Sequence, residues 1–296
     1  MPDCRHTYDR AMLRAKYNIP VIEVPMDNWR LIISSPSTGD KNMALDEAIL
    51  ETVSSGESPP TLRLYAWQPP CLSIGYAQPV ADVDRQRLDE LGWGLVRRPT
   101  GGRAILHSDE LTYAVIAANT NPHVAGGVLQ SYQHLSRGLV AALTMLGLHV
   151  EVQPNIPVPE EQRTNPVCFQ APSAYEITVR GRKLVGSAQV RRRGGVLQHG
   201  SLPLKGDITR ICQVLRFEGE ASSQQSVQSI RERAVTVEEL LGRQVPWQQA
   251  AEALIEGFTN AIGLSLDLQP PTEAEYKRAE MLVSSRYSQS SWTERI

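Results

Sequence analysis

The feature that most constrains the fold is a Gly-Gly turn set between strand-like runs. The stretch RRPTGGRAILHSDELTYA (97–114) places Gly101 and Gly102 after one apolar run and before two others. Glycine adopts positive φ at no steric cost and lets a ligand approach the backbone closely. The glycines lead into an apparent strand and no Gly-Lys-Ser/Thr follows, so the turn is neither a dinucleotide fingerprint nor a Walker A loop. Two interpretations remain: a tight β-turn, or a site whose backbone N–H groups hold an anion or a polarised carbonyl.

The segments around this turn predict a mixture of strands and helices. Period-two or short apolar runs predict strands at 29–34, 61–67, 71–77, 94–98, 104–107, 111–118, 148–152, 175–179, 183–191 and 196–204. Apolar residues at helical spacing predict helices at 42–53, 84–91, 128–146, 207–215, 236–241, 246–261 and 273–287. Thr236 with Glu239, and Thr272 with Glu275, fit capping boxes.

This order predicts an α/β fold, with a mixed β-sheet core flanked by helices. We expect an N-terminal extension over 1–27, a catalytic domain over 28–265, and a C-terminal helical segment over 266–296 that packs on the same domain. The segment 153–166 carries four prolines and is expected to be a loop.

Charge and cysteine content exclude several classes of protein. The chain has 30 basic and 32 acidic residues, a net charge of −2, whereas a general nucleic-acid binder carries a basic excess. Its longest apolar run, 139–148, is half of the ~20 residues that cross a bilayer, and the first residues have no apolar signal core. The four cysteines form no CxxC pair. We therefore expect a cytoplasmic protein with free thiols, no metal site, and no nucleic-acid or membrane partner.

Three separated stretches together resemble the biotin/lipoate protein ligase superfamily. They are NMALDEAIL (42–50), RRPTGGRAILHSDELTYAVI (97–116) and GRKLVGSAQVRRRGGVLQHGSLPL (181–204). The resemblance runs from about Trp29 to the C-terminal region and implies a ligase-like catalytic domain. ATP-using lipoate ligases continue the glycine motif with His-Asp…Gly-Asn-x-Asn, whereas this chain has HSDELTY. It also has NPVCFQAPSAYE (165–176) ahead of the lysine motif. Both features resemble octanoyltransferases that act between acyl carrier protein and lipoyl domains or the glycine-cleavage H protein.

The resemblance implies a set of site residues and no metal or nucleotide cofactor. Cys168 would be the nucleophile that forms a thioester, and Lys183 would contact the acyl carbonyl. The glycine motif would line a tunnel for a medium-length acyl chain. The implied substrate-binding residues are Arg98, Thr100, Gly101, Gly102, Arg103, His107, Gly186, Ser187 and Ala188. Cys212 follows Lys183, as in the other octanoyltransferase type, but it lies in an apolar helical pattern.

Each of these residues also has a structural interpretation. Cys168 could be a small buried hydrophobe, Lys183 a solvated hairpin residue, and His107 a hydrogen-bonded structural histidine. We expect one of Arg97 and Arg98 to be solvated. The run 180–193 has six basic residues and no acid, which fits either a solvated hairpin edge or a docking surface for acidic carriers.

Three other functions remain open from the sequence. An ATP-dependent lipoate ligase would need Mg²⁺ and an adenylate. An amidotransferase would move the acyl group between two lipoyl-type proteins by the same cysteine chemistry. A non-enzymatic carrier-binding module would leave the glycine turn and CFQAPS without a role.

Overall fold

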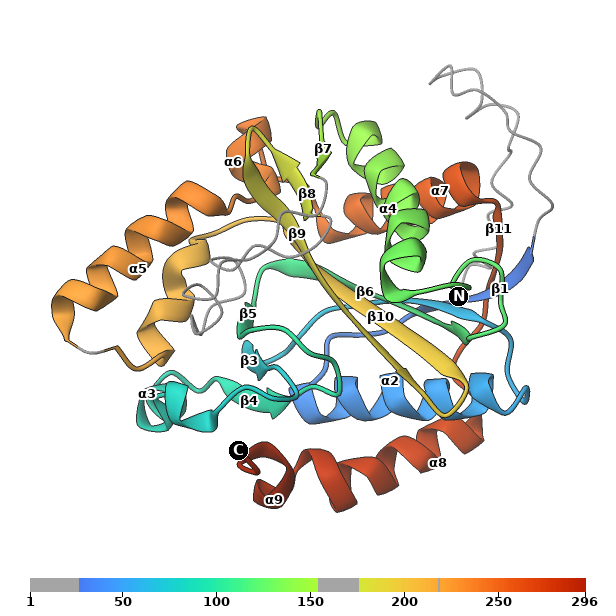
Figure 1. Cartoon of the computed structure of the whole chain (residues 1–296), viewed down its shortest axis with the longest axis horizontal. Helices are drawn as coiled ribbons and strands as arrows, with labels where there is room; N and C mark the ends of the chain where they lie inside the picture. The colour runs from blue at the N-terminus through green and yellow to red at the C-terminus, as the bar shows by residue number, and fades with distance from the viewer. Residues whose placement is uncertain (1–26, 154–175, 218) are drawn as a thin grey trace, which may run out of the picture.

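The computed structural model describes residues 27–153, 176–217 and 219–296, and within them a large mixed sheet forms the centre of the fold (Figure 1). Its strand order is β11-β1-β2-β6-β10-β9-β8-β7. The strands are β1 (Asp27–Ile33), β2 (Thr61–Tyr65), β6 (Glu110–Ala118), β7 (Glu151–Gln153), β8 (Glu176–Val179), β9 (Arg182–Arg192), β10 (Gly195–Pro203) and β11 (Leu264–Leu268). The pairs β11–β1 and β1–β2 are parallel, and the other pairs are antiparallel. The predicted mixed α/β core is confirmed.

A smaller sheet carries the glycine turn. It consists of β4 (Gly94–Arg97), β3 (Cys71–Ile74) and β5 (Ile105–His107), in that order. Because β3 pairs with both neighbours, the turn at 98–104 must cross from one side of β3 to the other. The turn therefore passes over the end of β3 rather than closing a simple hairpin.

Helices cover both faces of the large sheet (Figure 1). On one face lie α4 (Val128–Met145) and α7 (Trp247–Ile262), whose apolar sides join the sheet in one buried cluster. On the other face lie α2 (Gly39–Ser54) and α8 (Glu273–Leu282), with a second cluster beneath them. The remaining helical elements are η1 (Val80–Asp82), α3 (Arg85–Glu90), η3 (Ile208–Val214), α5 (Glu220–Arg233), α6 (Val237–Leu241), η4 (Val283–Tyr287) and α9 (Ser290–Thr293). None of the described helices is long and apolar enough to cross a membrane.

β2 is buried on both faces. Its side chains alternate between apolar and polar, yet all five residues are buried, because α2 covers the polar side. Arg63 is 1% exposed, and its guanidinium contacts Asp46 of α2 at 2.5 Å (Nη1–Oδ1) and the Asn42 side chain at 2.8 Å. A buried charge is tolerated when it is paired and hydrogen-bonded. The polar half of this strand therefore attaches the sheet to α2.

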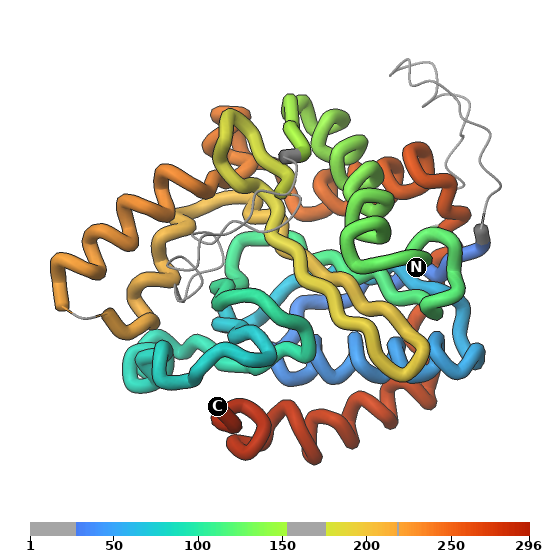
Figure 2. The backbone as a smooth tube through the Cα atoms, in the orientation of Figure 1, coloured from blue at the N-terminus to red at the C-terminus, as the bar shows by residue number. Residues whose placement is uncertain are grey.

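The predicted capping box at Thr272 contains the carboxylate that holds the C-terminal segment against β1 and α2. Thr272 and Glu275 form both bonds of the box, and the buried Glu275 carboxylate also pairs with Arg30 of β1 at 2.7 Å and accepts from Thr52 of α2. The box at Thr236 is only half formed, since Thr236 accepts from the Glu239 N–H without a return bond. In Figure 2 the chain end runs below α2 toward α3 and β4.

The sequence analysis missed α5 and β11, and also the short helices η1 and α9. Only two apolar residues of α5, Val227 and Ile230, pack in the core, so it has no clear apolar stripe. The short strand β11 pairs in parallel with β1, and the expected boundary at 265/266 falls inside it. The predicted helix at 207–215 is the 3₁₀ helix η3, and the predicted helix at 273–287 ends in the π-helical η4.

Candidate active site

The glycine turn between β4 and β5 is organised by Arg98. This side chain is buried and donates to the carbonyls of Gly101 (2.9 Å), Arg103 (2.7 Å) and Ser73 (3.1 Å). Gly102 has φ +91°, which favours glycine. The expectation that one of the two arginines is solvated is wrong. Arg97 is also buried, because its guanidinium donates to the carbonyls of the 75–78 loop and of Thr293.

A second glycine lets the turn lie against β3. A Cβ on Gly75 would sit 1.9 Å from the Gly102 carbonyl oxygen, and the Tyr76 N–H donates to the Thr100 carbonyl at 2.8 Å. No side chain fits at Gly75 unless the turn moves. The sequence analysis treated Gly75 as an ordinary strand residue, because a turn packed on it is visible only in three dimensions.

A cleft with about 420 Å³ of empty space opens beside this turn. It lies among α2, the two sheets and the β9–β10 hairpin. Its lining residues are Met43, Tyr65, Trp67, Ser73, Arg98, Gly102, Ile105, His107, Thr112, Gly186, Ser187, Ala188, His199, Gly200 and Ser201. The lining thus combines aromatic, aliphatic and backbone surface with a few polar groups, as small-molecule sites commonly do.

The cleft brings together six of the nine residues expected to bind substrate. They are Arg98, Gly102, His107, Gly186, Ser187 and Ala188. The other three, Thr100, Gly101 and Arg103, belong to the turn but do not line the described cleft. Thr100 is buried and contacts the cleft residue His199, whereas Gly101 is exposed.

His107 is hydrogen-bonded at both ring nitrogens. Nε2 lies 2.8 Å from Ser73 Oγ, and Nδ1 lies 2.7 Å from Glu110 Oε1. The Trp67 ring stacks on the imidazole at a centroid distance of 3.9 Å. Together, the two hydrogen bonds and the stacked Trp67 ring fix the orientation of the His107 imidazole.

A second histidine, His199, was missed as a site residue. Its Nε2 lies 2.7 Å from Thr100 Oγ1, and its Nδ1 lies 3.5 Å from Asp46 Oδ2. Burial lowers the pKa of His199, although Asp46 opposes the shift. Burial raises the pKa of Asp46, but Arg63 and His199 outweigh burial and hold it below its ordinary value. His199 lies in the motif VLQHGSLPL, which was the available signal.

Lys183 is a buried member of an ion pair. It is 3% exposed, and its Nζ lies 2.7 Å from Glu176 Oε1. The interpretation of Lys183 as a solvated hairpin residue is therefore wrong, although its expected contact with an acyl carbonyl stays a prediction. Glu176 follows directly on the segment 154–175, which lies outside the described residues and contains Cys168.

The two described cysteines are unsuited to act as nucleophiles. Cys71 is buried in β3, and burial raises the pKa of its thiol, with a further contribution from Asp40. Burial and then Asp207 raise the pKa of Cys212 to about 11. Because the thiolate is the reactive form, the raised pKa values disfavour both thiols as nucleophiles near neutral pH.

Most of the basic run 180–193 is engaged within the fold. Five of its six basic side chains have partners there: Arg182 with Glu239, Lys183 with Glu176, Arg191 with the Val124 and Gly126 carbonyls, Arg192 with Glu47, and Arg193 with Glu51. These contacts favour a structural role for the run over a free basic docking surface.

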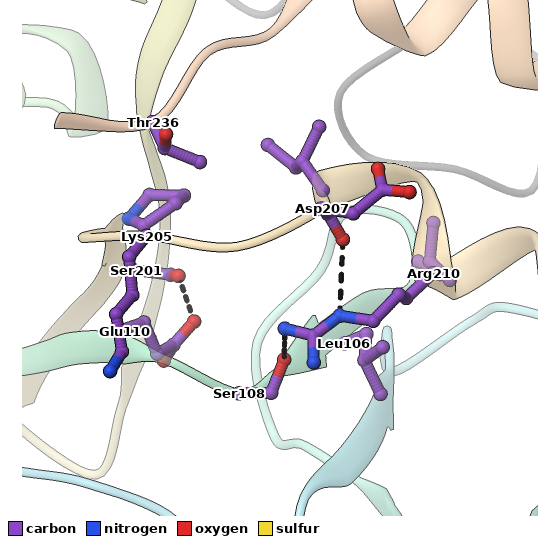
Figure 3. A pocket seen from close by; sticks show the side chains of 11 residues that line it. Leu106, Ser108, Glu110, Ser201, Lys205, Asp207, Arg210 and Thr236 are labelled. Carbon is purple, nitrogen blue, oxygen red and sulfur yellow. Dashed lines mark hydrogen bonds between the residues drawn. The ribbon is translucent and has the colours of Figure 1, made fainter. Parts of the chain in front are cut away.

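A second cleft, with about 400 Å³ of empty space, lies behind β5 and β10 (Figure 3). In Figure 3, Ser201, Glu110 and Lys205 face Asp207 and Arg210 across the opening. Ser201 lines both clefts. Within the described parts of the chain, no group of three or more His, Cys, Asp or Glu residues could hold a metal ion.

Comparison with known proteins places this architecture in a family. Residues 38–259 match the family described as Lipoyl protein ligase A/B catalytic domain. The chain is 42% identical over 278 residues to Octanoyltransferase LipM of Kyrpidia tusciae, covering 91% of this chain and 100% of that protein. It is also 42% identical over 273 residues to Octanoyltransferase LipM of Moorella thermoacetica, covering 92% and 100%.

A solved structure shares the fold and carries a ligand. Protein Ta0514 of Thermoplasma acidophilum, with bound lipoic acid, superposes with a TM-score of 0.73 at 25% identity, covering 91% of this chain and 99% of that one. The match extends over nearly the whole of both chains, as do the matches to the two transferases. This chain therefore belongs to the lipoyl protein ligase A/B catalytic-domain family and, within it, to the LipM-type octanoyltransferases, which are acyltransferases.

Proposed function

We propose that this chain transfers an octanoyl group from acyl carrier protein to a lysine of lipoyl domains or of the glycine-cleavage H protein, in lipoate biosynthesis. The observation that carries the proposal is the cleft between the glycine turn and the β9–β10 hairpin. Its aromatic and aliphatic walls suit an eight-carbon chain, and its few polar groups suit one carbonyl. Support comes from Ta0514, which shares the fold and binds lipoic acid, also an eight-carbon acid.

Cys168 would carry the octanoyl group between donor and acceptor. A thiolate is strongly nucleophilic, and a covalent intermediate divides acyl transfer into two easier steps. The raised thiol pKa values of Cys71 and Cys212 support this assignment, because those residues are poor competitors. Lys183 would place its ammonium near the carbonyl and stabilise the tetrahedral oxyanion.

The test of the reaction needs only purified components. The enzyme is incubated with octanoyl-carrier and an apo lipoyl domain, with and without ATP and Mg²⁺, and octanoylation of the acceptor is followed by intact mass. Transfer without nucleotide supports the proposal. Strict dependence on ATP and Mg²⁺ would instead identify an ATP-dependent lipoate ligase. Transfer only from an octanoylated lipoyl protein would identify an amidotransferase.

The role of Cys168 is tested on the enzyme alone. Octanoyl-carrier should leave an octanoyl adduct that hydroxylamine releases, and Cys168→Ser should lose both the adduct and overall transfer. Cys4→Ser, Cys71→Ser and Cys212→Ser are the matched controls and should keep the adduct. An adduct on Cys212 would favour the lysine-before-cysteine transferase type. Continued transfer with no adduct on any cysteine would rule out covalent catalysis.

A further inference from the structure

The cleft wall contains a chain of a hydroxyl, an imidazole and a carboxylate. Ser73 of β3 and His107 of β5 are joined at 2.8 Å, and His107 is joined to Glu110 of β6 at 2.7 Å. All three residues are at least 95% buried, and Ser73 and His107 both line the cleft. The register of β3 with β5 places Ser73 two positions from the partner of His107, on the same side of the small sheet.

The neighbouring hydrogen-bond donors determine where the hydrogens of the Ser73–His107–Glu110 series point. Glu110 also accepts from the Thr112 and Ser201 hydroxyls, so it acts as an acceptor toward every neighbour. In a neutral His107 the hydrogen therefore lies on Nδ1, facing Glu110, and Nε2 carries a lone pair. Arg98 donates to Ser73 Oγ at 3.1 Å, so the hydroxyl hydrogen of Ser73 is left to point at His107 Nε2.

This is the arrangement by which a histidine accepts a proton through a hydroxyl while a carboxylate stabilises the imidazolium. A comparable chain, Thr100–His199–Asp46, differs in two respects. Its imidazole–carboxylate distance is 3.5 Å, and Thr100 does not line the cleft. Ser73 is fully buried from solvent but belongs to the cleft wall. The geometry therefore singles out Ser73 among the two hydroxyls.

We propose that Ser73, His107 and Glu110 relay the proton that the acceptor lysine loses during amide formation. The proposal rests on the proposed function, and it adds the group that takes this proton. As the lysine side chain, in its neutral amine form, bonds to the thioester carbon, the nitrogen gives one proton to Ser73 Oγ, whose own proton passes to His107 Nε2. The C–S bond then breaks, the sulfur leaves as a thiolate, and His107 returns the proton through Ser73 to that sulfur. An amide and a thiol result, and the relay is restored.

The experiment separates the two half-reactions in the full chain. Octanoyl loading exchanges one thiol for another, so no amine proton leaves, whereas octanoyl transfer to an apo lipoyl domain requires its loss. Ser73→Ala should load at close to the wild-type rate and transfer roughly 10²-fold or more slowly, the usual contribution of general base catalysis. Ser136→Ala is the matched control, because Ser136 is buried in α4, donates to the Gln133 carbonyl of its own helix, and lines neither of the two clefts described above.

A second variant keeps the test informative if Ser73→Ala folds poorly. Glu110→Gln retains the size of the side chain but removes the charge that stabilises the imidazolium, so it should also slow transfer and spare loading. Equal slowing of both half-reactions would overturn the relay and indicate a distorted cleft instead. Unchanged transfer in either variant would also overturn the relay. If the wild-type enzyme itself octanoylates no lipoyl domain, the proposed function fails before any variant is compared.

Discussion

Replacing Gly75 with alanine should move the glycine turn by about an ångström. The new Cβ would lie 1.9 Å from the Gly102 carbonyl oxygen, against a shortest tolerable contact of 3.0 Å, so the turn must retreat by about 1.1 Å, the difference between the two. The obstructing atoms are backbone, which cannot rotate away. Overpacking of this kind typically lowers the free energy of unfolding by about 1–3 kcal/mol. Misplacement of binding groups by about 1 Å can cost about 10²-fold in rate.

The assay compares kcat for octanoyl transfer with the midpoint of thermal unfolding. Gly75→Ala should lower kcat about 10²-fold at temperatures where the protein remains folded. Gly127→Ala is the control, because its φ of −75° suits alanine and its new Cβ would meet only the Gln130 side chain, at 3.9 Å. A Gly75→Ala enzyme with wild-type kcat would show that the turn yields freely and that its position does not limit the reaction.

Two further predictions concern buried charges. Lys183→Ala should lower turnover by roughly 10²-fold or more through loss of an oxyanion donor, and a wild-type rate would contradict the catalytic role. The same variant should also destabilise the fold measurably in urea, since the ion pair between Lys183 and Glu176 is lost. The second prediction concerns Glu275. Burial raises the pKa of its carboxyl group, but the hydrogen bonds from Arg30, the Thr272 N–H and Thr52 outweigh burial, so the pKa is lowered. A carboxyl group whose pKa is lower in the folded state stabilises the fold at pH values above its unfolded-state pKa of about 4.3. This stabilisation is lost as the pH falls through the folded-state pKa. Glu275→Gln should therefore be less stable than wild type at pH 7, by about 3–5 kcal/mol of unfolding free energy. This difference in unfolding free energy should narrow below about pH 4. A difference that does not change with pH in denaturant melts would contradict the prediction.

Local signals in the sequence were sufficient for most of the elements. The alternation in TLRLY, the apolar spacing in NMALDEAIL and the caps at Thr236 and Thr272 lie at the expected helices and strands. Each of these signals depends on residues within four positions of one another, where propensity and capping act. Where the local signal was weak, as in α5 with its few core residues, prediction failed.

Long-range pairing decided the rest of the site. Arg98 and the glycine turn were identified in the sequence, but Ser73 and Trp67 were not, because nothing within a few residues of them indicates a shared cleft. His199 lies in one of the quoted motifs, but its place in the cleft follows only from the pairing of β10 with β6 and β9. Arg30 and Glu275 are 245 positions apart, yet their pairing determines where α8 packs.

By itself, the sequence determined the mixed α/β architecture, the position of the turn and, through its motifs, the family. Only the tertiary structure decided which faces of the sheets meet, and therefore which charges are buried in pairs and which residues share the cleft wall. The physical reason is that backbone conformation follows from near neighbours, whereas burial and side-chain pairing follow from how whole elements pack.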